Sequence, residues 1–143
     1  MKIQTADQIG VCSWSLQATG PQDLADKVTA IGLKKVQLGL TPHRDDPGTW
    51  EGVQEILGAA GISIASGMFS TIGEDYTTPE TIRRTGGIVP DEHWEGNLSI
   101  AESAAALAQQ MGIRLVTSHA GFLPHEPSDP NFDKLTDRVV AIS

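Results

Sequence analysis

His119 is the residue of this chain whose type and position are best suited to chemistry. An apolar run over residues 114–119 predicts a strand that ends at this histidine, and Ala120-Gly121-Phe122 follows it. A neutral imidazole at the carboxyl end of a strand can accept a proton, bind a divalent metal or hydrogen-bond a hydroxyl group. The alternative is a buried histidine whose ring bonds a backbone carbonyl or Ser118. We take His119 as the candidate catalytic residue and as the candidate metal ligand, although the sequence defines no complete metal site.

Three further residues stand at or near the ends of predicted strands and could contact a substrate. Trp14 closes the first predicted strand and could stack on the apolar face of a sugar ring, or it could simply fill the core. Gln37 lies on the polar face of the second strand, where it could hydrogen-bond a substrate or a neighbouring side chain. Met68, near the end of the third strand, is expected to form apolar pocket wall. Together with His119, these are the candidate substrate-binding residues.

The other acidic and imidazole side chains indicate no site. His43, Asp45 and Asp46 gather in one segment, but their spacing matches no metal site, and a solvated loop is expected. Glu74-Asp75 and Asp91-Glu92-His93 are expected to be charges on a loop surface and in the first turn of a helix. The sequence has no G-x-G-x-x-G, no phosphate-binding P-loop, no G-x-S-x-G and no cysteine pair. Nucleotide-binding, flavin and serine-hydrolase functions are therefore disfavoured.

Three glycines mark the elements that must position these residues. Gly32, Gly61 and Gly112 each follow an amphipathic stretch and precede a branched apolar residue and a short apolar run. Glycine at such a junction allows the left-handed conformation that ends a helix. Helix leading repeatedly into strand predicts an α/β fold of parallel β/α units. The predicted strands are residues 9–14, 35–40, 62–69 and 114–119.

Four helices and two long connections complete the predicted order of elements. The first helix follows Gly20-Pro21, the second spans residues 50–60, and the third runs from residue 91 or 99 to residue 111. The fourth helix starts after Asp129-Pro130 and carries Phe132, Leu135 and Val139 on one side. The polar segment 41–48 is expected to be irregular. Residues 70–90 are long for a loop between strand and helix, and such loops are often lids or binding loops. Within them, Thr78-Pro79-Glu80 could begin a short helix that Gly86-Gly87 ends.

Composition restricts the class of protein. The 143 residues suit a single domain over 1–143, and the formal net charge is −8. This charge repels phosphate backbones and anionic lipid, so neither a nucleic acid nor a membrane is expected as a partner. The lone Cys12 cannot form an internal disulfide and fits a reducing compartment. No secretory signal and no run of about 18 apolar residues is visible, so a cytoplasmic location is expected.

Four segments of the chain together resemble one family. They are IGVCSWSL near the start, KKVQLGL in the second strand, GISIASGMFS in the third and VTSHAGFLP in the fourth. The chain resembles the N-terminal half of the sugar phosphate isomerase/epimerase family, in the xylose isomerase-like TIM barrel superfamily that also includes AP endonuclease type 2 proteins. HAGFLP is the most specific element. The resemblance runs along essentially the whole chain but covers only the first half of the family's barrel.

The resemblance implies a (β/α)8 barrel that binds a divalent metal (Mn, Mg, Zn or Co) at its mouth. The implied reaction is isomerisation or epimerisation of a small carbohydrate by proton transfer next to a carbonyl. In the epimerase branch the metal ligands lie at the ends of strands five to eight, which are absent here. In the endonuclease branch a histidine ending strand four ligates metal, and His119 matches it. The partner histidine at the end of strand three is missing, since Ser66, Gly67 and Met68 stand there, which argues against DNA repair.

The resulting hypothesis is half of a TIM barrel from a metal-dependent sugar isomerase or epimerase. In the intact barrel Trp14, Gln37, Met68 and His119 would line the substrate pocket, with His119 nearest the metal. The 143 residues alone are expected to be inactive, because they offer one ligand where a metal site needs three or four. The sequence ends at Ser143 in mid-helix, which favours a fragment.

The sequence is also compatible with two other functions. One is a non-catalytic half-barrel that forms a homodimer through its open sheet edges, which predicts a size that depends on concentration. The other is a small doubly wound α/β binding module, which predicts helices on both faces of the sheet rather than on one. The sequence names neither the sugar, the metal nor the direction of the reaction.

Overall fold

The computed structural model describes residues 8–143, which divide into two compact units. Unit 1 comprises residues 8–68 and 104–117, and unit 2 comprises residues 69–103 and 118–143. Buried apolar side chains occur in both, for example Leu57 in unit 1 and Ile88 in unit 2. The assignment of the chain to a single domain stays a prediction.

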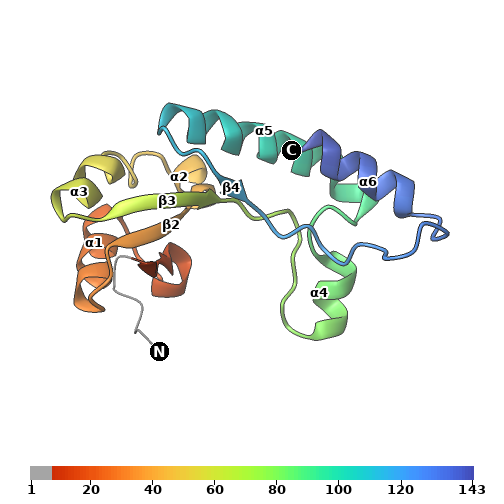
Figure 1. The fold of residues 1–143 in the computed structure, drawn as a ribbon, viewed down its shortest axis with the longest axis horizontal. Helices are drawn as coiled ribbons and strands as arrows, with labels where there is room; N and C mark the ends of the chain where they lie inside the picture. The colour runs from red at the N-terminus through yellow and green to blue at the C-terminus, as the bar shows by residue number, and fades with distance from the viewer. Residues whose placement is uncertain (1–7) are drawn as a thin grey trace. The chain divides into compact units, whose positions relative to one another are not determined.

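Unit 1 is built on a parallel four-stranded sheet in the order β1-β2-β3-β4 (Figure 1). Its strands are β1 (Val11–Cys12), β2 (Lys35–Gly39), β3 (Ser63–Met68) and β4 (Val116–Thr117), and each neighbouring pair is parallel. Helices α1 (Pro21–Ala30) and α3 (Val53–Ala59) connect successive strands and contact each other. Right-handed crossovers between strands in sequential order place the connecting helices on one face. A doubly wound sheet needs a reversal of strand order, which the sequential order β1-β2-β3-β4 does not have.

The core of unit 1 follows the predicted apolar faces. Val36 and Leu38 alternate along β2 and are fully buried, while Gln37 between them is only half-buried. Leu24 of α1 and Leu57 of α3 are also fully buried. Burial of one such side chain contributes roughly 1.5–3 kcal/mol to the stability of the fold. Apolar residues therefore recur at the spacing that places them on the buried face, and this spacing predicted these positions.

The glycines that end the three helices adopt the predicted conformation. Gly32, Gly61 and Gly112 have φ values of +74°, +70° and +66°. A Cβ at any of them would meet no atom within 4 Å. These glycines are therefore required by backbone conformation alone and not by close packing.

The first strand is shorter than predicted, and Trp14 lies outside it. β1 ends at Cys12, and a 3₁₀-helix over Ser13–Leu16 follows. The chain turns there because the buried Ser13 hydroxyl accepts a hydrogen bond from the Gly39 backbone N–H at 2.8 Å. The Trp14 ring packs on the end of β2, where a Cβ on Gly39 would approach ring carbon Cε3 to 2.8 Å.

The fourth strand is also shorter than the predicted residues 114–119. Thr117 pairs with Met68, which is the last residue of β3. Residues 118 and 119 therefore have no strand residue opposite them. His119 stands two residues beyond β4 and not on the strand.

Two predictions about the segment between β2 and β3 are wrong in detail. Residues 41–48 are not wholly irregular, because α2 (Leu40–Asp45) forms there. Pro42 is tolerated since it lies in the first turn, where no helical N–H partner is lost. The next helix begins at Val53 rather than near residue 50, because Gly52 has a φ of +71°.

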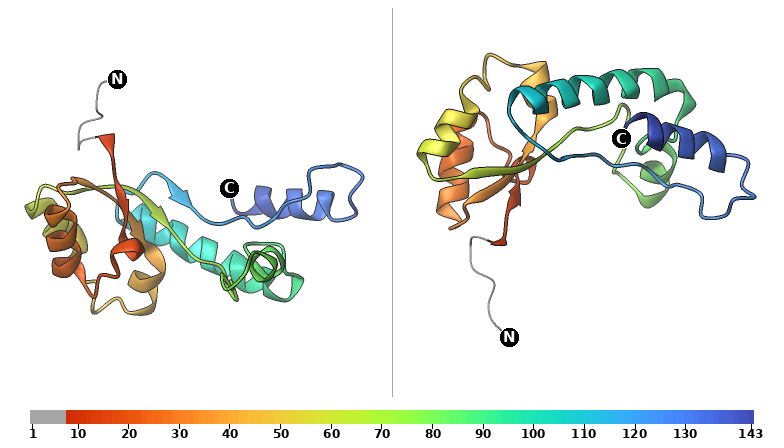
Figure 2. Two further views of the ribbon diagram at one scale, coloured as in Figure 1. Left: turned by 90° about the horizontal axis from the view of Figure 1, so that it is seen from below. Right: turned by 45° about the horizontal axis from the view of Figure 1, so that its top comes forward.

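Unit 2 contains α4 (Pro79–Thr85), the first part of α5 (Trp94–Gln110) and α6 (Phe132–Ala141). These helices were predicted, and the Thr78 hydroxyl caps α4 by accepting a hydrogen bond from the Thr81 N–H at 3.1 Å. A long irregular segment precedes α6 (Figure 2). Asn131 occupies the N-cap position of α6, so this helix starts directly after Asp129-Pro130, as predicted.

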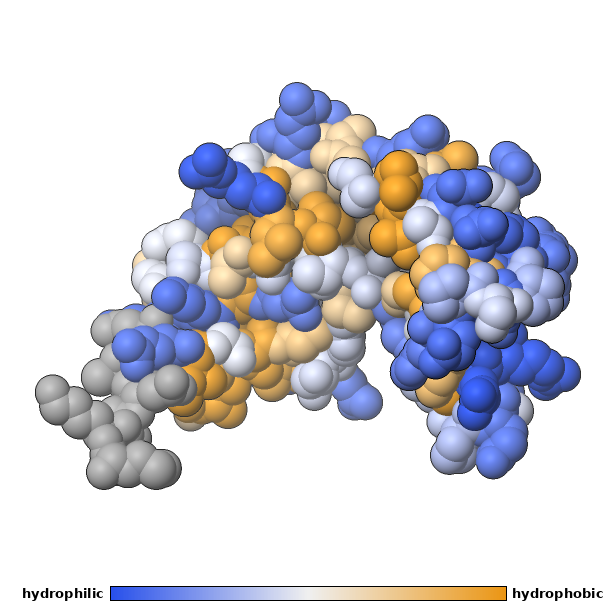
Figure 3. Space-filling model, turned by 45° about the vertical axis from the view of Figure 1, so that its right-hand side comes forward, coloured by the Kyte–Doolittle hydropathy of each residue, from blue (hydrophilic) through white to orange (hydrophobic). Residues whose placement is uncertain are grey.

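Exposed apolar side chains remain in unit 1. Ile9 is 44% exposed, Trp14 39% and Leu115 57%. Figure 3 shows patches of apolar surface in orange on the face that it displays. Within residues 8–143, β1 and β4 each have a strand neighbour on one side only. Open edges of this kind favour pairing with another polypeptide.

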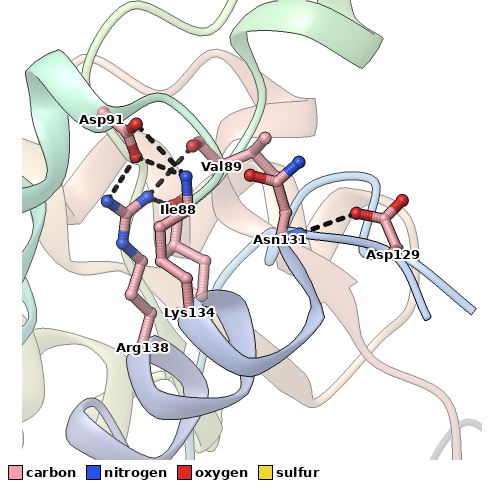
Figure 4. A network of polar contacts seen from close by, with 7 residues as sticks. All are labelled: Ile88, Val89, Asp91, Asp129, Asn131, Lys134 and Arg138. Atoms are coloured by element: carbon pink, nitrogen blue, oxygen red, sulfur yellow. Dashed lines mark hydrogen bonds and ion pairs between the residues drawn. The ribbon is translucent and has the colours of Figure 1, made fainter. Parts of the chain in front are cut away.

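Arg138 of α6 is 8% exposed and fixes this helix to the segment that precedes α5 (Figure 4). Its Nη1 donates hydrogen bonds to the backbone carbonyls of Ile88 at 2.8 Å and Val89 at 3.0 Å. Its Nη2 pairs with Asp91 at 2.6 Å, and Lys134 contacts the same carboxylate at 2.9 Å. Asp91, which was predicted as a charge in the first turn of a helix, thus also binds two side chains of α6.

No helix in residues 8–143 has both the length and the apolar character needed to cross a bilayer. The prediction that no secretory signal is present concerns the N-terminus, of which residues 1–7 lie outside the described part of the chain.

Candidate functional site

The candidate site lies in unit 2, where His119 contacts a carboxylate from the long loop 70–90. Nδ1 of His119 lies 3.2 Å from Oε1 of Glu74. The Glu74 side chain is 9% exposed, whereas that of His119 is 33% exposed. A nearly buried carboxylate therefore holds one side of an imidazole that is one-third exposed.

Glu74 is itself held by its surroundings. Oε1 of Glu74 accepts a hydrogen bond from the Gly87 backbone N–H at 3.3 Å. Partial desolvation raises the pKa of the Tyr76 phenol, and the charge of Glu74 and a hydrogen bond to it raise that pKa further. Tyr76 consequently stays protonated at neutral pH and can act as a hydrogen-bond donor.

Two adjacent glycines form a close-fitting wall beside the imidazole. A Cβ on Gly86 would approach Cε1 of His119 to 2.8 Å. A Cβ on Gly87 would lie 2.2 Å from the carbonyl carbon of Ala120, and Ile88 donates a backbone hydrogen bond to the Ala120 carbonyl oxygen at 3.1 Å. The Gly86-Gly87 pair, predicted only as a helix stop, thus lets the loop backbone reach the residues around His119.

Aromatic rings flank His119 and lead to a pocket. The ring centroids of Tyr76 and Phe122 lie 6.2 Å and 6.3 Å from that of His119. The Arg83 guanidinium lies 5.8 Å from the Phe122 centroid. Arg83 and Phe122 also line a pocket of about 830 Å³ together with residues that include Val89, Asn131 and Leu135. Unit 2 therefore has space for a small ligand beside the ring that contacts His119.

The contact with Glu74 determines which nitrogen of His119 can react. A carboxylate that accepts this hydrogen bond is paired with the tautomer in which Nδ1 carries the hydrogen. In the neutral ring Nε2 then bears the lone pair that can accept a proton or a hydrogen bond. This is the arrangement expected of a general base that a second residue orients.

The other predicted site residues lie in unit 1. Gln37 donates from Nε2 to the hydroxyls of Ser66 and Thr117, each at 3.1 Å, so it links β2 to β3 and β4. Both amide hydrogens are thereby used by neighbouring strands. Trp14 packs on Gly39, and Met68 ends β3 half-buried. Substrate binding by these three residues stays a prediction.

The side chains within residues 8–143 do not form a complete metal site. No group of three or more His, Cys, Asp or Glu side chains is close enough to hold a metal ion in this part of the chain. His119 and Glu74 are two potential donors, and a divalent site takes at least three protein ligands or several waters. The site as described does not by itself fit the metal that the resemblance implies.

Cys12 is not a candidate nucleophile. Burial raises the pKa of its thiol, more than the hydrogen bonds from the backbone of Trp14 and Ser15 lower it. The thiolate, which is the reactive form, is therefore disfavoured at neutral pH.

The important residue that sequence reasoning missed is Glu74. The sequence predicts Glu74 as a charge on a loop surface, and no local pattern indicates its contact with His119. The length of the loop over 70–90 was the available signal, since long loops of this kind often carry binding residues.

Comparison with solved structures defines the fold. The chain superposes on the crystal structure of a xylose isomerase domain protein from Planctomyces limnophilus with a TM-score of 0.77 and 23% sequence identity. The match covers 95% of this chain and 49% of that one. The fold is half of a xylose isomerase-like barrel. This confirms the predicted fold class and the predicted resemblance in fold.

The chain spans about half the length of the protein that it matches. No protein-family model matches the chain, and no curated protein matches it. The half-barrel assignment therefore depends on structure, and the activity does not follow from the fold alone.

Proposed function

We propose that this chain is the half of a sugar isomerase or epimerase that supplies the proton-transferring residue. The observation that carries the proposal is the contact between His119 and the nearly buried Glu74, two residues beyond β4. Loops that follow parallel strands carry the active sites of β/α barrels. Similarity to half of a xylose isomerase domain supports the substrate class, a small carbohydrate.

The proposed step is proton transfer next to a carbonyl. Nε2 of His119 takes the proton from the carbon beside the carbonyl, and the electrons of that C–H bond move onto the carbonyl oxygen as an enediolate forms. For isomerisation, the imidazolium returns the proton to the former carbonyl carbon, while the hydroxyl proton on the deprotonated carbon passes to the former carbonyl oxygen. For epimerisation, a second acid protonates the deprotonated carbon from the opposite face, and His119 releases its proton to solvent. Glu74 keeps Nδ1 protonated throughout and holds the ring in place.

The chain does not supply everything this chemistry needs. A divalent metal would stabilise negative charge on the substrate oxygens, but the described side chains give too few ligands for one. We propose that the missing ligands come from the other half of the barrel. The isolated 143 residues are accordingly expected to bind sugar weakly and to show no turnover.

The test is hydrogen exchange by the gene product in the length that its source cells make. Ketoses and aldoses are incubated with it in D₂O together with Mn²⁺, Mg²⁺, Zn²⁺ or Co²⁺, and ¹H NMR follows loss of the proton next to the carbonyl. His119→Asn should lower kcat by about 10²- to 10⁴-fold, as expected for removal of a general base. His43→Asn, on α2 and outside the candidate site, is the matched control and should retain the activity of the unmutated protein.

Retention of full activity by His119→Asn would contradict the proposal. Failure to exchange the proton of any carbohydrate with any of the four metals would contradict it as well.

A second candidate function is association through the open sheet edges. The observation that favours it is the exposed Leu115 beside edge strand β4. We propose a homodimer of this chain as that alternative, and sedimentation velocity from low to high micromolar concentration tests it. A sedimentation coefficient that rises with concentration, and that falls back in Leu115→Lys, supports self-association. A constant monomer value rules it out.

A further inference from the structure

We propose that Asn97 is a positioning residue, which sets Glu74 against His119 by joining the two ends of the loop that carries Glu74. This inference rests on the proposed function, because it gives the reason for holding His119 in one orientation. Asn97 lies on α5, three residues after its first, and is 1% exposed. A buried amide needs hydrogen-bond partners, and the partners of Asn97 define its role.

Asn97 contacts both ends of the loop. Its Oδ1 accepts a hydrogen bond from the Ile72 backbone N–H at 2.8 Å, and its Nδ2 donates to the Gly87 backbone carbonyl at 3.2 Å. The loop from Ile72 to Gly87 is thus closed at its neck by one side chain. Glu74 lies just inside this neck.

The Gly87 peptide connects Asn97 with the candidate site. Its carbonyl accepts the Asn97 hydrogen bond, and its own N–H donates to Glu74 Oε1. The same carboxylate oxygen contacts Nδ1 of His119. A chain of four groups therefore runs from the buried amide through one glycine and one carboxylate to the imidazole.

A hydrogen bond within the loop also joins its two arms, so the contacts of Asn97 with Ile72 and Gly87 are expected to determine the position of the loop as a whole. Asp75 donates its backbone N–H to the Thr85 hydroxyl at 3.0 Å, and Thr85 is the last residue of α4. The two arms of the loop are joined there independently of Asn97. Loss of the Asn97 contacts should then move the loop and not unfold it.

The predicted consequence is a change of tautomer at His119. A histidine side chain free in water favours the Nε2–H tautomer, whereas the contact with Glu74 requires Nδ1–H. Long-range ¹H–¹⁵N NMR of the ¹⁵N-labelled chain distinguishes the two forms, and the His119→Asn variant identifies the His119 signals among the four histidines. We expect Nδ1–H to be the main form in the unmutated chain and Nε2–H to become the main form in Asn97→Asp.

The controls separate positioning from stability. Asn97→Asp keeps the size of the side chain and an acceptor for Ile72, but it removes the donor to Gly87. Ala101→Gly weakens α5 without touching either end of the loop and should leave the tautomer unchanged. Glu74→Ala is the positive reference and should give the Nε2–H form.

A folded Asn97→Asp variant with the tautomer of the unmutated chain would overturn the proposal. If that variant does not fold, amide hydrogen exchange of the unmutated chain decides. The Ile72 and Gly87 amides should exchange slowly and at similar rates, and rapid exchange of either one would overturn the proposal. Because no substrate is present, these results are independent of whether the proposed sugar chemistry is correct.

Discussion

Gly87→Ala is expected to lower the free energy of unfolding by roughly 2–4 kcal/mol. The φ of Gly87 is +68°, which a residue with a Cβ adopts at a cost of about 1 kcal/mol. The added methyl would also lie 2.2 Å from the carbonyl carbon of Ala120 and 2.3 Å from the backbone nitrogen of Gly121. These are backbone atoms beside His119, so no flexible side chain can move aside to relieve the contact.

Gly112→Ala is the matched control for this substitution. Gly112 has nearly the same φ, +66°, but a Cβ there would meet no atom within 4 Å. It should therefore cost about 1 kcal/mol, the conformational part alone. Urea unfolding followed by circular dichroism measures both variants. Equal losses at the two positions would show that the backbone around Gly87 is not packed as closely as described.

Arg138→Met is expected to destabilise the chain by roughly 2–4 kcal/mol. The substitution keeps an apolar stem of similar length but removes the donors to the carbonyls of Ile88 and Val89. A buried carbonyl that loses its partner costs about 1–3 kcal/mol. The contact of the guanidinium with the Trp94 ring, 5.0 Å from its centroid, is lost as well.

Lys134→Met provides the matched control because Lys134 contacts the same Asp91 carboxylate from the same helix. Its side chain is 39% exposed and bonds no backbone carbonyl in that network, so its loss should cost less than about 1 kcal/mol. Thermal or urea unfolding of both variants gives the comparison. A loss for Lys134→Met as large as that for Arg138→Met would mean that the ion pair, and not the carbonyl bonds, anchors α6.

The pH dependence separates these two contributions further. Hydrogen bonds from Lys134 first, and then from Arg138, lower the pKa of Asp91 from its ordinary 3.8. The lowered pKa means that the ion pairs stabilise the fold above pH 3.8 and lose this effect as the pH falls through the folded value. The difference between the unmutated chain and Arg138→Met should therefore narrow in acid without vanishing, because the carbonyl bonds do not titrate.

Most of the architecture could be predicted from local patterns in the sequence. Gly32, Gly61 and Gly112 mark the ends of helices, and the apolar spacing in β2 marks its buried face. Both features depend on residues nearby in the sequence, so the parallel half-barrel was predictable. Strand ends were not, since β4 stops where its partner β3 stops, at the pair of Met68 and Thr117. That limit is set by a strand about fifty residues away in sequence.

The candidate site was predicted only in part, for a related reason. His119 was recognisable because a strand precedes it, and this local signal proved sufficient. Glu74 and Asn97 were not recognisable, because each acts through a contact across the loop that only the folded chain creates. For Gln37, the sequence showed a polar side chain on β2 but not its partners, which are hydroxyl groups on β3 and β4.

A crystal structure of the gene product, in the length that its source cells make and with a ketose bound, would show directly whether His119 contacts the substrate. We expect an oxygen or the exchanging carbon of the sugar to lie within about 3–3.5 Å of Nε2 of His119, while Nδ1 remains in contact with Glu74. A sugar bound elsewhere, out of contact with His119, would contradict it. So would a bound complex in which Glu74 has left the imidazole.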